Sequence, residues 1–179
     1  MQRAEILDAL RDVGAELVAA GGQGDVYLVG GAAMALGYDR ERATRDVDGL
    51  FAPKQEVYAA ARRVAERRGL QTDWLNDAVK GFLLGPDRGS TQVIELPGLR
   101  VEVASAETVL VMKAIAHRAG EDDADLRLLA ARLGLDAGGV LDLVERTAGP
   151  RWLTVQVQLF VESVLDSRAD EPPPHPSGA

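Results

Sequence analysis

Two short segments of the chain carry most of the information about its fold: LVGG at residues 28–31 and TRDVDGLF at residues 44–51. The first segment ends a β-branched and apolar run that indicates a buried strand. Paired glycines after such a strand let the backbone turn sharply and approach a ligand closely. In the second segment Asp46 and Asp48 alternate with a valine. A strand there would project both carboxylates from one face of a sheet.

These parts suit phosphoryl and nucleotidyl transfer, which depend mainly on charge neutralisation and in-line positioning. Carboxylate oxygens suit Mg²⁺, which keeps some of its waters and also binds substrate phosphates. Backbone amides after the two glycines can face a phosphate at the start of the next helix. A third carboxylate would complete a two-metal site, and Glu102 is the natural candidate. A strand beside the one that carries Asp46 and Asp48 would bring all three carboxylates to one surface.

Hydrophobic periodicity predicts helices before and after these segments. The order of elements, strands with helices first and then helices alone, predicts an α+β or α/β core with a helical C-terminal portion. We expect an α/β core over residues 1–104, a helical portion over 105–166, and a disordered tail over 167–179. The expected helices are 4–20, 32–36, 54–68, 73–82, 105–115, 123–133, 136–147 and 151–164, and the expected strands are 25–29, 45–51, 92–96 and 99–103, the last two forming a hairpin.

Composition narrows the possible chemistry. The 179 residues contain no cysteine and two histidines, which excludes thiolate metal sites and cysteine nucleophiles. A net charge of −8 argues against a broad nucleic-acid-binding surface. A local excess of basic residues follows the first glycine pair, where Arg40, Arg42 and Arg45 could clamp phosphates, guide RNA, or remain solvated loop charges. No apolar run reaches the ~20 residues of a membrane-spanning helix, and we expect a cytoplasmic protein without a membrane partner.

Gly30-Gly31 followed by Asp46-x-Asp48 resembles the signature of the DNA polymerase beta-like nucleotidyltransferase superfamily. The longer strings LVGGAAM (28–34) and TRDVD (44–48) look like its prokaryotic AbiEii/MenT-type branch. So does the string from Val103 to Ala114, followed by Asp122-x-x-Asp125-Leu126. The likeness spans roughly residues 25 to 133, and Gly31 stands where the superfamily often has serine. The resemblance implies an α+β fold with a mixed β-sheet flanked by helices.

The same resemblance implies roles for individual residues. Asp46 and Asp48 would hold Mg²⁺, with Glu102 as the candidate third ligand. Lys113 would contact the triphosphate, and Asp125 would support the catalytic site. Nucleotide binding would fall to Gly30, Gly31, Thr44, Arg45 and Lys113.

Many proteins of this branch are toxins of toxin–antitoxin pairs that add nucleotides to the 3′ end of tRNA. The leading hypothesis is therefore an NTP-dependent and Mg²⁺-dependent enzyme acting on tRNA, with a cognate antitoxin as partner. A second hypothesis keeps the reaction and changes the acceptor to a small molecule such as an aminoglycoside, or to a protein hydroxyl. A third is a catalytically inactive module that binds nucleotides.

Overall fold

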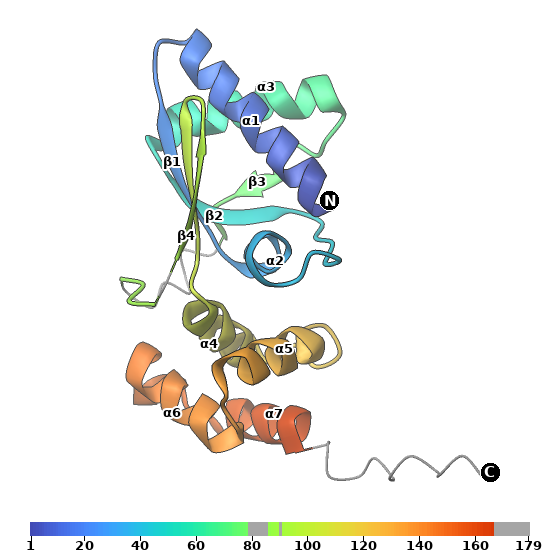
Figure 1. Ribbon diagram of the computed structural model, residues 1–179, viewed down its shortest axis with the longest axis vertical. Helices are drawn as coiled ribbons and strands as arrows, with labels where there is room; N and C mark the ends of the chain where they lie inside the picture. The colour runs from blue at the N-terminus through green and yellow to red at the C-terminus, as the bar shows by residue number, and fades with distance from the viewer. Residues whose placement is uncertain (79–85, 90, 167–179) are drawn as a thin grey trace, which may run out of the picture.

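The computed structural model describes residues 1–78, 86–89 and 91–166. Its centre is a five-stranded mixed sheet with the strand order β3-β2-β1-β5-β4 (Figure 1). The strands are β1 (Gly24–Leu28), β2 (Val47–Ala52), β3 (Leu75–Asn76), β4 (Gln92–Leu96) and β5 (Leu99–Val103). The pair β1/β5 is parallel, whereas β1/β2 and β4/β5 are antiparallel. The α+β class expected from the sequence is confirmed.

Helices cover one face of this sheet and continue beyond one of its edges. The two helices α1 (Arg3–Ala19) and α3 (Lys54–Arg68) lie side by side on the sheet, and the later helices form a separate layer below it in Figure 1. The remaining helical segments are α2 (Gly30–Ala33), a π-helical turn (Met34–Tyr38), α4 (Ala106–Ala116), α5 (Asp123–Leu133), α6 (Ala137–Ala148), a 3-10 turn (Pro150–Trp152) and α7 (Val155–Asp166). Within the described ranges, no helix has the length and apolar character needed to cross a membrane.

The core begins between the sheet and the helices α1 and α3, and it continues into the helical portion through buried residues such as Leu110, Leu126 and Val161. Val26, Leu28 and Val101 are at most 1% exposed and alternate with polar or half-buried residues along their strands. Gly24 faces the same helices, since a Cβ there would lie 2.9 Å from a methyl group of Val57 on α3. The opposite sheet face, which carries Tyr27, is not covered in this way.

Strand direction gathers the residues of interest at one edge of the sheet. Because β1 and β5 are parallel, both end at this edge, and Gly30 and Ser105 follow directly. Because β2 is antiparallel to β1, it begins there, next to Asp46. The Val29 amide donates to the Asp48 carbonyl over 3.0 Å, which fixes the turn after β1 against the start of β2.

Two expectations need correction. Asp46 does not belong to β2, which begins at Val47, so the two acids are not an i, i+2 pair within one strand. The helix expected at 73–82 is wrong where the chain is described: Leu75 and Asn76 pair with β2, and the Trp74 indole donates to the Ala61 carbonyl over 3.1 Å. The end of that range, from residue 79, lies outside the described residues.

The strand that carries Glu102 does not lie beside β2. β5, which carries Glu102, pairs with β1 and β4, so β1 separates it from β2. The 92–103 hairpin and the helices expected at 105–115, 123–133 and 136–147 are confirmed. The helix expected over 151–164 begins only at Val155, after a 3-10 turn over Pro150–Trp152. The expected tail, 167–179, lies outside the described residues.

Candidate active site

A polar cavity of about 510 Å³ opens at the sheet edge where β1 ends and β2 begins. Its lining combines acids and cations from both halves of the chain. Asp46 and Asp48 come from the start of β2, whereas Lys113 and Arg118 come from α4 and the loop after it. The remaining lining residues are Gly31, Arg42, Ala43, Thr44, Arg45, Gly120, Glu121 and Asp122.

The two glycines are required by close contacts. Gly30 has φ +59°, in the left-handed region, and a Cβ there would lie 3.2 Å from the Asp48 carboxylate. A Cβ on Gly31 would lie 2.5 Å from the Thr44 hydroxyl oxygen. The Thr44 hydroxyl, which donates to the Asp46 carbonyl over 3.0 Å, therefore occupies the space that a side chain at position 31 would take. This packing holds the loop before β2 against the turn after β1.

The surroundings of Asp48 in the polar cavity disfavour its charged form. Burial and then the neighbouring charge of Asp46 raise the pKa of Asp48 above its usual value. Both side chains are half-buried. Two half-buried carboxylates of like charge form a site that a cation would stabilise.

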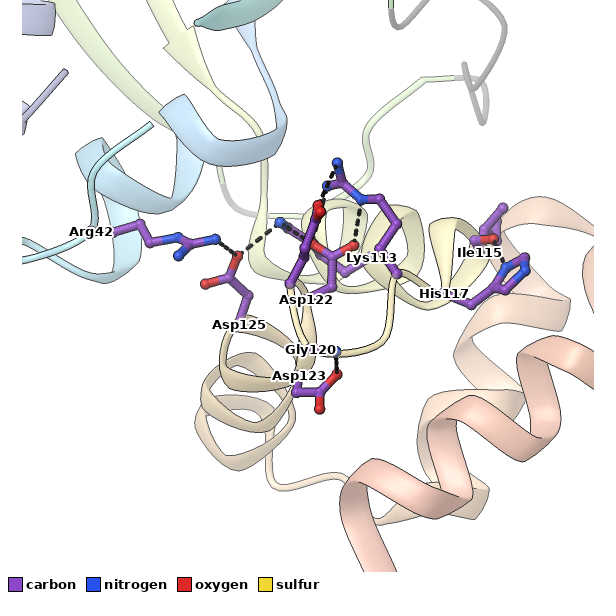
Figure 2. Close-up of polar contacts among 10 residues, drawn as sticks. Arg42, Lys113, Ile115, His117, Gly120, Asp122, Asp123 and Asp125 are labelled. Carbon is purple, nitrogen blue, oxygen red and sulfur yellow. Dashed lines mark hydrogen bonds and ion pairs between the residues drawn. The ribbon is translucent and has the colours of Figure 1, made fainter. Parts of the chain in front are cut away.

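Lys113 is the centre of a buried network of charges (Figure 2). Its ammonium lies 2.6 Å from a carboxylate oxygen of Asp122 and 2.8 Å from one of Asp125. The side chain of Lys113 is 5% exposed, and those of Asp122 and Asp125 are 0% and 3% exposed. Arg118 also donates to Asp122, with its Nε 2.9 Å from the second carboxylate oxygen.

Arg42 links this network to the α/β core. It donates to Asp125 over 3.0 Å from the loop that precedes β2, as Figure 2 shows. Asp125 thus has two cationic partners from separate parts of the fold, Arg42 and Lys113. This arrangement suits a positioning role for Asp125, since its carboxylate is already engaged with both cations.

Glu102 lies apart from the polar cavity. It shares a sheet face with Asp48, because it aligns across β1 with Tyr27 and Leu50, and Leu50 is two residues beyond Asp48 on β2. Its carboxylate is 3.2 Å from Arg100 and lines a different, shallower cavity. Among the described residues, no group of three or more His, Cys, Asp or Glu side chains is arranged to hold a metal ion. The metal-binding role of Glu102 stays a prediction.

A second, mostly apolar cavity of about 540 Å³ lies next to the polar one. Asp48, Lys113 and Arg118 line both. The two cavities therefore meet at these three charged side chains.

Sequence reasoning missed two members of the site, Arg118 and Asp122, as functional residues. They lie four residues apart in the turn between α4, which ends at Ala116, and α5, which begins at Asp123, so no helical i, i+4 pattern predicted their ion pair. Their meeting with Lys113 was not readable from the sequence, because it depends on the turn between α4 and α5. Comparison of the chain with known protein families, curated proteins and solved structures found no match.

Proposed function

We propose that the protein is a Mg²⁺-dependent nucleotidyltransferase, which transfers a nucleotide from an NTP to the hydroxyl of an acceptor. The observation that carries the proposal is the polar cavity, in which the Asp46/Asp48 pair faces Lys113 and Arg118. An NTP–metal complex needs both kinds of group, because carboxylates hold the metal and cations neutralise the phosphates.

The donor set fits Mg²⁺. Asp46 and Asp48 offer hard oxygen ligands beside an open polar cavity. Burial and then repulsion by Asp46 raise the pKa of Asp48, and a bound divalent cation would favour its charged form. Two carboxylates suffice for an ion that fills its other positions with water and substrate phosphate. Bound there, Mg²⁺ would neutralise charge on the phosphates and favour departure of the leaving group.

The protein's own residues would then bind and orient the substrate. Lys113, held in place by Asp122 and Asp125, and the exposed Arg118 would contact the triphosphate. Thr44 and Arg45 line the same cavity and would contact the outer phosphates of the NTP. The acceptor oxygen would attack the α-phosphorus as the bond to the β-phosphate bridging oxygen breaks. Pyrophosphate leaves, and the hydroxyl proton passes to a carboxylate of the cavity or to water.

We propose the 3′ end of tRNA as the acceptor, with the protein acting as the toxin of a toxin–antitoxin pair. This choice rests on the sequence resemblance. It is supported by a local basic rim, formed by Arg45 and Arg118 at the polar cavity and by the exposed Arg40 on the same loop as Arg45. Transfer to an RNA end needs only such a rim, since the acceptor presents a single-stranded terminus.

A cationic small molecule is the second candidate acceptor, favoured by the charge of the sheet face that carries Tyr27. Next to Tyr27, this face carries the acids Asp25, Glu95 and Glu102. Its one arginine on β5, Arg100, is already within 3.2 Å of Glu102 and 3.6 Å of Glu95. An acidic surface attracts a polycationic acceptor and repels the RNA backbone.

The deciding experiment offers several acceptors to one enzyme preparation. Purified protein is incubated with each α-labelled NTP, Mg²⁺ and either total tRNA, an aminoglycoside or a protein mixture. We expect label on tRNA that is lost in Asp46→Asn and Asp48→Asn and kept in Glu66→Gln, which removes an exposed acid on α3. Label on the aminoglycoside alone would select the second candidate. Absence of label from every acceptor would contradict the proposed reaction.

A further inference from the structure

The apolar cavity is built mainly from one face of α4. Val109, Met112 and Ala116 contribute its wall from successive turns, and Trp152 contributes an aromatic ring from the 3-10 turn before α7. Its volume of about 540 Å³ lies within the ~300–1,000 Å³ typical of small-molecule sites. A cavity of this kind suits a flat and weakly polar group.

The cavity is continuous with the proposed phosphate site. Asp48, Lys113 and Arg118 form its charged side, and all three also line the polar cavity. A ligand with phosphates on one side of Lys113 can therefore place an apolar group on the other side. An NTP has this construction, with its base separated from its triphosphate by the ribose.

His117 gives the cavity a defined hydrogen-bonding group. It ends α4 with φ 40°, and it is the only described residue other than glycine with a positive φ. Its Nδ1 lies 2.7 Å from the Ile115 carbonyl oxygen (Figure 2). A carbonyl oxygen can only accept, so Nδ1 carries the hydrogen, and Nε2 of the neutral ring is left as an acceptor. The residue lines the cavity and is exposed to solvent.

We propose that the apolar cavity binds the nucleobase of the NTP and that His117 Nε2 accepts a hydrogen bond from an exocyclic amino group of that base. The inference rests on the proposed function, because it assigns one part of the same substrate. It makes His117 a specificity-determining residue. Cytosine offers an amino donor at the position where uracil offers a carbonyl, and adenine differs from hypoxanthine in the same way.

The test measures equilibrium binding of matched nucleotide pairs, with Mg²⁺ and without acceptor. We expect wild-type protein to bind CTP up to about tenfold more tightly than UTP, and ATP more tightly than ITP, the size expected for the net contribution of one hydrogen bond. His117→Phe keeps a flat ring without an acceptor, and it should bring both ratios close to one. His117→Asn keeps an acceptor and tolerates the left-handed backbone, so it controls for the conformation of this residue.

A second variant tests the position of the base independently of His117. Met112→Trp fills part of the apolar cavity from the middle of α4, and it should weaken binding of every NTP while leaving inorganic triphosphate binding unchanged. Equal affinity of the wild type for CTP and UTP, or full NTP affinity in Met112→Trp, would overturn the inference alone. Failure of the wild type to bind either NTP or triphosphate would overturn the proposed function together with it.

Discussion

The charged groups between α1 and α3 and those around Lys113 use the same chemistry in different surroundings. On the outer surface, Glu16 receives hydrogen bonds from Arg63 and Arg67, and Asp12 lies 2.7 Å from Arg68. The side chains of Asp12 and Arg68 are each 35% exposed, whereas that of Asp122 is fully buried.

The two sets of ion pairs have different roles because they differ in exposure to solvent. Exposed ion pairs are screened by solvent and contribute little to the free energy of unfolding. The pairs between α1 and α3 therefore serve mainly as a hydrated outer surface of two packed helices. A buried charge loses its hydration, and each member depends on its partners. The network therefore fixes the ammonium group of Lys113 at the polar cavity. We interpret it as part of the candidate active site rather than as a source of stability.

The largest effect is expected from breaking the buried network. Asp122→Ala leaves the ammonium of Lys113 with a single carboxylate partner, Asp125, in a buried position. We expect the free energy of unfolding to fall by about 3 kcal/mol, measured by urea denaturation. Asp142→Ala, an exposed acid on α6, should change it by less than about 0.5 kcal/mol. Equal effects of the two substitutions would remove the distinction between buried and exposed charge.

An intermediate effect is expected from packing in the cavity wall. Gly31→Ala brings a methyl group to within 2.5 Å of the Thr44 hydroxyl, and the resulting strain should cost about 1–3 kcal/mol of stability. Gly22→Ala meets only a backbone oxygen at 3.7 Å and serves as the control. In a double-mutant cycle with Thr44→Gly, the two changes should couple by about 1 kcal/mol. Additive effects would show that the contact between residues 31 and 44 is not the cause.

The smallest effect is expected on the outer surface. The hydrogen bond from Arg68 lowers the pKa of Asp12, so this carboxylate stabilises the fold above about pH 4 and loses its contribution as the pH falls through the lowered pKa. Asp12→Asn should reduce stability at pH 7 by less than about 0.5 kcal/mol. The difference from wild type should disappear in acid, which thermal unfolding at several pH values would measure. A loss as large as that of Asp122→Ala would contradict the interpretation of the surface pairs.

Local sequence signals predicted local structure well. The glycine pair after a buried run, the hairpin across Pro97 and Gly98, and the Ser105 cap each depend on residues close in sequence, and all three are present. The misassigned segment at 73–82 contains Trp74, whose burial and hydrogen bond to α3 belong to tertiary structure. Local sequence signals could not predict the strand order, because the position of β1 between β2 and β5 depends on long-range pairing.

The candidate site was predictable only in its separate pieces. The sequence predicted that Asp46 and Asp48 share one face of a strand, and both acids line the polar cavity although only Asp48 lies in β2. The contacts of Lys113 with Asp122 and Asp125 join α4 to the start of α5, and the Arg42 contact joins a loop to a helix 83 residues away. No local pattern reports contacts of that kind, since they exist only once the helical portion packs below the sheet.

The central claim is that the polar cavity directs attack at the α-phosphorus of an NTP. The most direct measurement incubates the protein and its acceptor with Mg²⁺ and the preferred NTP, labelled at the α-phosphate in one sample and at the γ-phosphate in the other. We expect label on the acceptor from the α-labelled sample only, with the γ-label recovered in pyrophosphate, and loss of transfer in Lys113→Met. Transfer of the γ-label to the acceptor would instead identify a phosphotransferase and contradict the claim.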